Sequence, residues 1–383
     1  MRGDFSRFTH DPTRHYRGVL MQQGRVQLDA DWNEGQAIAS RWLRTLTDDV
    51  VGACGVPIHI DAFRIDPSAS TDFAISKGRM YVEGLLCELD QDAAYATQPD
   101  YPSAPALDFS ALKDGATRND IVYLDAWYRT ISAVEDPHLR EVALGGPDTA
   151  ERLQLIAQVK VLQDAGADVT CATPFDMLTP TGGGTLQLTV AATPAPPAPC
   201  DPIAQGGYQG PDNRLYRVEI HDRGPLGTAT FKWSRDNGSV VAAVTQFNSP
   251  TELVLQSLGR DYYLKLKKGD FVEVTDDVLD LAGSPGLLAS IVDENEADRA
   301  IILSAAVPNA VVNGVGRHPK VRRWDGGAAQ ATAAAALPLE HGLSITFGAT
   351  SIDFRSGDYW TFAARAVDLS LIHISEPTRQ AEI

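Results

Sequence analysis

Short runs in which every second residue is apolar, separated by turn residues, fill most of the chain from Ile58 onward. In residues 215–221, Tyr216, Val218 and Ile220 fall on one face of an extended backbone, and charged residues fall on the other. β-branched and aromatic residues are enriched in these runs, which favours strands over helices. We therefore expect a mainly β, multi-domain protein, with strands in residues 73–76, 78–89, 120–129, 153–162, 186–190, 215–221, 231–244, 262–274 and 286–303.

Turn sequences indicate how some of these strands pair. Asn237-Gly238 favours the positive φ angles of a type I′ turn, so we expect a hairpin between residues 231–234 and 239–244. Glu83-Gly84 predicts a similar pairing within residues 78–89. Residues 255–307 suggest a small barrel-like module of four or five strands, whose chain returns through residues 321–325 and 357–362.

One segment has the periodicity of a helix instead. Between residues 31 and 51, apolar residues recur at steps of three and four, and the pattern ends at Gly52. We expect one long N-terminal amphipathic helix here. Its stripe faces either the core, which is the commoner arrangement, or a partner; the stripe comprises Ile38, Trp42, Leu43, Leu46 and Val50.

The segment before this helix combines structural signals with almost no catalytic chemistry. Residues 18–22 and 25–28 are short alternating runs on either side of Gln23-Gly24, which predicts a hairpin. Asp31 and Glu34 have the spacing of a helix capping box. Such a hairpin-plus-helix segment fits docking onto another protein, and the candidate interface residues are Tyr16, Arg25, Trp32 and Trp42, with Trp127 as a further aromatic anchor or core residue.

Composition shifts along the chain suggest five parts. We expect a docking segment at residues 1–52, a β-rich domain at 53–165, a Pro/Gly-rich linker or excursion at 166–206, and a second β-rich domain at 207–368 that contains the barrel-like module. Residues 369–380 correspond codon for codon to one reading frame of a sequencing-library adapter. We therefore expect residues 369–383 to be a non-native tail that replaces the true C-terminus.

Composition also limits the classes of function. The 383 residues carry a formal charge of −17, which argues against general nucleic-acid binding. No run is long and apolar enough to span a membrane, and no secretory signal opens the chain, so we expect a cytoplasmic protein. The four cysteines lie far apart without a C-x-x-C pair, which indicates inert thiols and no metal site; they are Cys54, Cys87, Cys171 and Cys200.

Two acidic clusters have both a structural and a functional interpretation. Carboxylates near the helix start either bind a divalent cation or complement the helix dipole. A second group after a predicted strand either supplies a glycosidase carboxylate pair or forms a common Asp-rich turn. The structural interpretation is favoured for both clusters, which are Asp29, Asp31 and Glu34, and Asp276, Asp277 and Asp280.

One basic patch, Arg322-Arg323-Trp324, has the residues to bind a phosphate, a carboxylate or a sugar face. In an acidic protein, pairing with internal carboxylates such as Asp325 is the favoured alternative. A nucleophile elbow and a phosphate-binding loop are absent from the sequence, so we expect no enzyme activity and no cofactor.

Several long blocks resemble one family. They include GDFSRFTHDPTRHYRGVLMQQGRVQLDADWNE, REVALGGPDTAER, GPDNRLYRVEIH, TFKWSRDNGSVV, HPKVRRWD and RSGDYW. The chain resembles an uncharacterised bacterial family of unknown function that is encoded near phage-tail-like genes of contractile injection systems. The first block is also similar to the start of phage tail and fibre proteins, which implies that it anchors the chain in a larger assembly.

This resemblance implies a non-enzymatic structural component of a phage-tail-like contractile particle, at the baseplate or as a fibre-like attachment. Its partners would be other subunits of the particle, and it could also form a homo-oligomer. The alternative is a carbohydrate-binding or carbohydrate-cleaving tail protein. That alternative needs aromatic side chains exposed beside Asp or Glu, for which the candidates are Trp233, Trp324 and Trp360.

Overall fold

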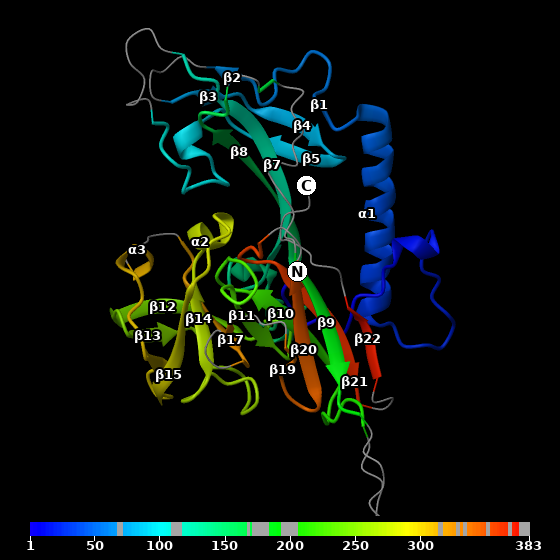
Figure 1. Cartoon of the computed structure of the whole chain (residues 1–383), viewed down its shortest axis with the longest axis vertical. Coiled ribbons are helices and arrows are strands. Elements are labelled where there is room, and N and C mark those ends of the chain that lie inside the picture. The colour runs from blue at the N-terminus through cyan, green and yellow to red at the C-terminus, as the bar shows by residue number, and fades with distance from the viewer. Residues whose placement is uncertain are drawn as a thin grey trace, which may run out of the picture. The chain divides into compact units, whose positions relative to one another are not determined.

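A computed structural model of the chain is mainly β with one long helix, which confirms the predicted fold class (Figure 1). The structure describes residues 1–66, 72–108, 117–166, 169–170, 184–192, 206–312, 317–326, 330–331, 335–349, 353–366 and 370–374. The chain divides into two compact units. Unit 1 comprises Met1–Phe8, Thr130–Arg152 and Gly182–Arg379, and unit 2 comprises Thr9–Arg129, Leu153–Thr181 and Gln380–Ile383.

Unit 2 contains the long helix α1 (Asp29–Val51) and small antiparallel sheets. One sheet has the order β1-β4-β5 and another β2-β3-β6; β7 and β8 form a two-stranded ribbon. Glu83-Gly84 turns the chain between β4 and β5 with φ angles of 45° and 77°, as predicted. The strands are β1 (Cys54–Gly55), β2 (Ile65–Asp66), β3 (Ala74–Ile75), β4 (Gly78–Val82), β5 (Leu85–Leu89), β6 (Ala93–Ala94), β7 (Ile121–Ile131) and β8 (Arg152–Leu162).

Two small apolar clusters hold unit 2 together. One gathers Phe73, Ile75, Tyr95 and Val159, and the other gathers Leu85, Cys87 and Ala126. Short 3-10 helices occur at η1 (Pro12–Arg14) and η2 (Tyr95–Thr97) in this unit, and at η3 (Pro137–Leu139) and η4 (Val142–Leu144) in unit 1.

The start of α1 differs from the prediction, whereas its end at Gly52 is confirmed. The helix begins at Asp29, and its N-cap residue is Leu28, whose side chain has no oxygen to cap with. The predicted capping box is therefore wrong. Glu34 instead accepts a hydrogen bond from the Thr9 hydroxyl at 2.6 Å, so its carboxylate fixes the preceding segment.

The predicted hairpin at residues 18–28 is also wrong, although its turn forms. Gly24 has a φ of 70°, and Arg25 N donates to Gln22 O at 3.3 Å. Residues 15–28 are described throughout and contain no strand. A two-stranded hairpin needs an apolar face covered by other structure, and here Leu20 and Val26 are exposed.

Unit 1 contains a closed barrel, which confirms the predicted barrel-like module. It has six strands rather than four or five and extends on both sides of residues 255–307, whereas residues 357–362, expected to close it, contribute no strand to it. Its apolar core includes Val272, Val274, Ile301 and Val321. The strand order is β12 (Val241–Ser249), β13 (Glu252–Leu255), β16 (Ala300–Leu303), β15 (Leu287–Asn295), β14 (Phe271–Thr275) and β17 (Lys320–Trp324), with helices α2 (Asp277–Leu281) and α3 (Asn309–Val312) in its connections.

Two further sheets of unit 1 pack around an aromatic core that includes Tyr216, Phe347 and Trp360. The five-stranded sheet has the order β18 (Gln330–Ala331), β11 (Thr230–Ser234), β10 (Arg214–Ile220), β21 (Tyr359–Arg365) and β22 (Ser370–Ile374). The three-stranded sheet has the order β19 (Leu337–Pro338), β20 (Leu343–Ala349) and β9 (Gly184–Val190). Strand β22 falls in the tail predicted to be non-native, and its backbone pairs with β21.

The Asn237-Gly238 turn has the predicted conformation, with φ angles of 50° and 66°, but it does not close a hairpin. Strand β11 pairs with β10 and β18, whereas β12 pairs with β13 and β17. The turn instead passes the chain from the five-stranded sheet into the barrel. The pairing prediction was wrong because the turn lies between two sheets, and each flanking strand pairs with other strands of its own sheet.

The predicted linker contains the strand expected at residues 186–190, now seen as β9, while most of its other residues, with Cys171 and Cys200, lie outside the described residues. Each of the two compact units is made of stretches that are distant in sequence. The domain boundaries predicted at residues 52, 165 and 206 therefore stay a prediction. Among the described helices, none is long and apolar enough to cross a membrane.

Candidate functional site

The four residues predicted to dock onto a partner are all exposed and belong to unit 2. Tyr16 and Arg25 lie in the segment before α1, and Trp32 and Trp42 lie on α1. The exposed fraction is 55% for Tyr16 and 59% for each of the two tryptophans. Trp127 is buried and is therefore a core residue.

A continuous stripe along α1 is exposed, and we call it the seam. Its members follow one another at alternating steps of four and three residues, the spacing with which one helix packs against another. Leu43 and Val50 have exposed fractions of 61% and 76%. The seam comprises Trp32, Gln36, Ala39, Leu43, Leu46 and Val50, with Trp42 at its edge.

The opposite side of α1 attaches the helix to unit 2. Ala30 and Ile38 are buried, and Arg44 Nε donates to the Glu83 carbonyl at 3.0 Å. Of the stripe predicted from the sequence, only Ile38 is buried, so the expectation of a core-facing stripe is wrong for its other four residues. The apolar surface of α1 thus points mainly to solvent.

Residues 12–28, which we call the arm, precede α1 and are almost entirely exposed. Leu20 has an exposed fraction of 92%, and Val19 lies 3.9 Å from the place where a Gly35 side chain would begin. The arm carries three arginines and no acidic residue, in a chain whose net charge is −17. It is therefore a basic, apolar segment beside the seam.

The first residues of the chain behave differently, because they bind unit 1. Asn237 Nδ2 donates to the Gly3 carbonyl at 3.0 Å, and Arg365 donates to the Ser6 carbonyl at 3.1 Å. The Met1 amine donates to the Tyr359 hydroxyl at 2.5 Å. The predicted docking segment at residues 1–52 is thus divided: its first residues are held internally, and its arm and helix are exposed.

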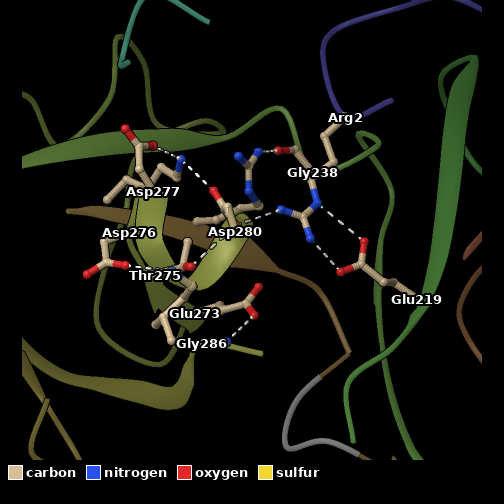
Figure 2. A network of polar contacts seen from close by, with 12 residues as sticks. Arg2, Glu219, Gly238, Glu273, Thr275, Asp276, Asp277, Asp280 and Gly286 are labelled. Atoms are coloured by element: carbon tan, nitrogen blue, oxygen red, sulfur yellow. Dashed lines mark hydrogen bonds and ion pairs between the residues drawn. The ribbon is translucent and has the colours of Figure 1, made fainter. Parts of the chain in front are cut away.

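Arg2 reaches into the interior of unit 1, where Figure 2 shows its guanidinium between two carboxylates. Its Nη2 donates to Glu219 Oε1 at 2.6 Å, and its Nη1 lies 3.9 Å from Asp280 Oδ1. Burial opposes the charged form of Glu219, but Arg2, Arg217 and Lys232 outweigh this effect and hold its pKa well below the usual range. Glu219 is therefore a fully ionised anchor for Arg2.

The ionic network continues from the five-stranded sheet to the barrel. Lys232 of β11 lies 3.2 Å from Glu219 and donates to Glu273 of β14 at 2.6 Å. Trp324 Nε1 donates to the other oxygen of Glu273 at 3.0 Å, and the Lys232 ammonium lies 4.6 Å from the Trp324 ring centroid. All four side chains are buried, and the carboxylates of Glu219 and Glu273 share the buried Lys232 ammonium as a partner.

A second part of the network surrounds Lys320. Its ammonium lies 2.6 Å from Asp280, 2.7 Å from Glu135 and 3.4 Å from Asp277. Burial alone would raise the pKa of Glu135 and of Asp280, but Lys320 outweighs it and lowers each pKa to about 2. Asp276 caps α2 by accepting a hydrogen bond from Leu279 N at 2.9 Å. These acidic residues are structural, as the sequence favoured.

The basic patch predicted to bind a ligand lies on β17 in the interior. Arg322 donates to the Gly238 carbonyl, and Arg323 donates to the Tyr263 carbonyl at 2.6 Å. Arg323 also lies 3.8 Å from Asp325, which is the internal pairing offered as the alternative. All three patch residues face internal partners rather than a surface ligand.

One carboxylate stands apart from this matched set. Burial raises the pKa of Glu151 to about 7, although Arg322 opposes the shift. Glu151 Oε2 is buried and has no hydrogen-bond partner in the described chain, and a side chain at Gly3 would begin 2.4 Å from it. Glu151 therefore packs against the N-terminal residues as a group that is easily protonated.

Several other predicted site residues have simple placements. Trp233, Trp324 and Trp360 are buried, so they do not form the exposed platform that the carbohydrate alternative needs. Cys54 is exposed, whereas burial raises the pKa of Cys87 to about 12. Within the described residues, no group of three or more His, Cys, Asp and Glu side chains could hold a metal ion.

Sequence reasoning missed the buried network and an exposed tyrosine pair. Charged residues at alternate positions of β10 and β17, together with Glu273 of β14, were the available signal for the network, because buried charged side chains have to pair with one another. Tyr262 and Tyr263 lie on the loop between β13 and β14, with exposed fractions of 72% and 78%. The lysines that follow them are common in exposed loops, so the sequence around the two tyrosines gave no distinctive signal.

Comparison with known proteins places the whole chain in one family. The family of unknown function DUF6519 matches residues 1–179 and 180–380. No curated protein and no solved structure matches the chain. The two matched stretches together cover nearly all of the sequence, so the chain belongs to this family of unknown function, DUF6519.

Proposed function

We propose that this protein is a non-enzymatic structural subunit that docks onto its neighbours in a phage-tail-like contractile particle, at the baseplate or as a fibre-like attachment. The observation that carries the proposal is the exposed apolar surface of the arm and the seam. Eleven large apolar residues between Tyr16 and Val51 are exposed. A large aromatic side chain covers roughly 150–250 Å², and eight of the eleven residues are smaller aliphatic or methionine side chains, so their summed exposed surface is on the order of 1,000 Å²; the largest contiguous patch of a typical monomer is about 300–600 Å².

The chemistry of the interior supports a structural role. The carboxylates of the Arg2 and Lys320 clusters are paired with cations, and the pKa values of Glu135, Glu219, Glu273 and Asp280 are lowered. A general acid needs the opposite shift, toward the working pH. The particle itself is proposed from the resemblance of the first block to phage tail and fibre proteins.

Incorporation of seam variants into particles tests this function. We expect Leu43→Glu combined with Leu46→Glu to reduce incorporation at least tenfold, because two charges would have to be buried in the interface. Protein content of purified particles is measured by quantitative mass spectrometry. Substitution is preferable to deleting residues 1–52, because Met1 to Ser6 also stabilise unit 1.

Thr45→Glu is the matched control. Thr45 is exposed on α1 and lies away from the seam, so the same charge there should leave incorporation unchanged. Circular dichroism and thermal unfolding confirm that all variants are folded. Normal incorporation of the folded Leu43→Glu, Leu46→Glu protein would contradict docking through α1.

Carbohydrate binding is a second candidate, which one observation favours. Tyr262 and Tyr263 form an exposed pair with ring centroids 5.9 Å apart, and Asp261 fixes their loop by accepting from Tyr263 N and Leu264 N at 2.9 Å. Sugars stack on exposed aromatic faces beside polar groups. The test is a glycan array probed with the full chain and with Tyr262→Ala and Tyr263→Ala. Carbohydrate binding would be excluded if the full chain bound no glycan through these tyrosines and hydrolysed no saccharide.

A further inference from the structure

We propose that the partner of the seam is α1 of a second copy of this chain, packed antiparallel to it; the inference rests on the docking role proposed above. The first argument is the length of the seam. The four-three spacing continues without interruption over 19 residues, from Trp32 to Val50. That spacing fits the knobs-into-holes packing of another helix, and it extends over about 27 Å at 1.5 Å per residue.

The flanks of the seam suit an identical helix. One flank carries Asn33, Ser40 and Thr47, and the other carries Gly35, Trp42 and Asp49. Seams that select a different helix usually use charged flanks of complementary sign. Here one residue of six is charged, so two identical seams meet without a row of like charges.

Side-chain sizes favour the antiparallel direction. When two seams are centred on Arg41, Ala39 of one copy lies opposite Leu43 of the other, and Trp32 lies opposite Val50. Each of these layers pairs a smaller side chain with a larger one, as close packing requires. A parallel pair would instead place Trp32 on Trp32 and Ala39 on Ala39, which crowds one layer and leaves the other underfilled.

Charge complementarity supports the same direction. The last turn of α1 contains Asp48 and Asp49 and no basic residue, which is unfavourable at the negative end of a helix dipole. An antiparallel neighbour would bring this acidic end beside Gly35, where the basic arm of the first copy lies. Arg17 and Arg25 are exposed in the arm, which approaches Gly35 through Val19, so they are the cations available to the two aspartates of the second copy, and the reverse contact would occur at the other end.

The available surface is also sufficient. A stable interface buries about 800 Å² on each partner, and the arm and seam together expose apolar surface of that order. The seam alone would provide only part of it. The arm is therefore an integral part of the expected contact.

The test is the mass of the purified full chain in solution, by light scattering and sedimentation equilibrium. We expect a dimer of the 41.3 kDa chain at micromolar concentration, monomers for Leu43→Glu, and a dimer for the control Thr45→Glu. Exchanging the charges between the arm and the end of α1 tests the proposed ion pairs. Arg17→Glu with Arg25→Glu should weaken the dimer at least tenfold, and adding Asp48→Arg with Asp49→Arg should restore it.

Cross-linking tests the direction. The parent for this test carries Cys54→Ser, Cys171→Ser and Cys200→Ser, and must itself give no product with a short bifunctional maleimide. In this parent, Ser40→Cys should cross-link two copies because it lies near the centre of the pair. Val50→Cys should not, because its two copies would lie about 27 Å apart. Cross-linking through Val50→Cys alone would overturn the antiparallel arrangement.

A monomeric wild-type chain at 100 µM would overturn self-association. If the seam variants nevertheless failed to enter particles, docking would stand and its partner would be a different subunit. If the chain dimerised through the seam while the variants entered particles normally, self-association would stand and the proposed docking onto the particle would fall.

Discussion

The interior of unit 1 and the surface of α1 reverse the usual distribution of residues. In unit 1, Lys232, Glu273 and Lys320 are buried together, whereas on α1 the large apolar residues Trp32, Leu43 and Val50 are exposed. The buried charges have partners within the chain, and the exposed apolar residues do not bury one another. The difference teaches that unusual burial alone does not identify a functional surface; what matters is whether the group is satisfied within the chain.

The largest expected effect comes from breaking the buried network. Glu219→Gln should destabilise the protein by about 3–5 kcal/mol, because three buried cations lose their shared carboxylate. Urea unfolding of the full chain measures the change. Glu296→Gln is the matched control: Glu296 pairs with Lys265 at the surface, so its loss should change the stability far less. Equal losses of stability in the two variants would mean that the buried network contributes no more than a surface ion pair.

Acid should weaken the same network. The folded-state pKa of Glu135 is about 2, below its ordinary value of 4.5, so its stabilising contribution is present above about pH 4.5 and is lost as the pH falls toward 2. The contribution is about 3 kcal/mol. Unfolding measured from pH 6 to pH 2 should show this loss, and Glu135→Gln should show a smaller one. A profile unaffected by Glu135→Gln would contradict the assigned ion pair.

Glu151 should show the opposite pH dependence. Its folded-state pKa of about 7 lies above the ordinary value of 4.5, so stability falls as the pH rises from about 4.5 through 7. Glu151→Gln removes the ionisation and should stabilise the protein at pH 8 by about 1–2 kcal/mol, after allowance for the partial exposure of this side chain. The two proteins should be equally stable at pH 4. Destabilisation by Glu151→Gln at pH 8 would show that its charge is matched after all.

The smallest effect on folding is expected at the seam. Leu43→Glu should change the free energy of unfolding of the monomer by no more than about 0.5 kcal/mol, because the side chain is already in solvent. Denaturation at nanomolar concentration separates this value from any contribution of self-association. A loss above about 2 kcal/mol would mean that Leu43 packs within its own chain, and the contrast with unit 1 would fail.

Much of the fold follows from local pattern. The strands at residues 120–129 and 215–221, the barrel-like module and the helix end at Gly52 were all predictable, because periodicity and turn chemistry act over a few residues. The pairing across Asn237-Gly238 was not, since the turn residues set the backbone angles but not which strands pair with β11 and β12. The capping box failed because α1 begins at Asp29, so that Asp31 lies inside the helix and cannot cap it.

The candidate site was less predictable than the fold. Alternation in β10 places Glu219 opposite the apolar residues, but it cannot say whether that face meets water or the charged face of β14. Likewise, spacing on α1 predicts an apolar stripe without saying what covers it. Both questions depend on residues far away in the sequence. The expectation of a core-facing stripe was wrong for this reason, whereas the pairing of Arg323 with Asp325, expected from the acidic composition of the chain, is observed.

The arm is attached to α1 at both ends, by the hydrogen bond from the Thr9 hydroxyl to Glu34 just before the arm, and by the chain itself where the arm runs into Asp29. A neighbour that pulled on a bound arm would therefore load the start of α1 at two points at once, one a hydrogen bond and one the covalent chain. Such a closed loop would pass tension into the helix rather than peel away from it.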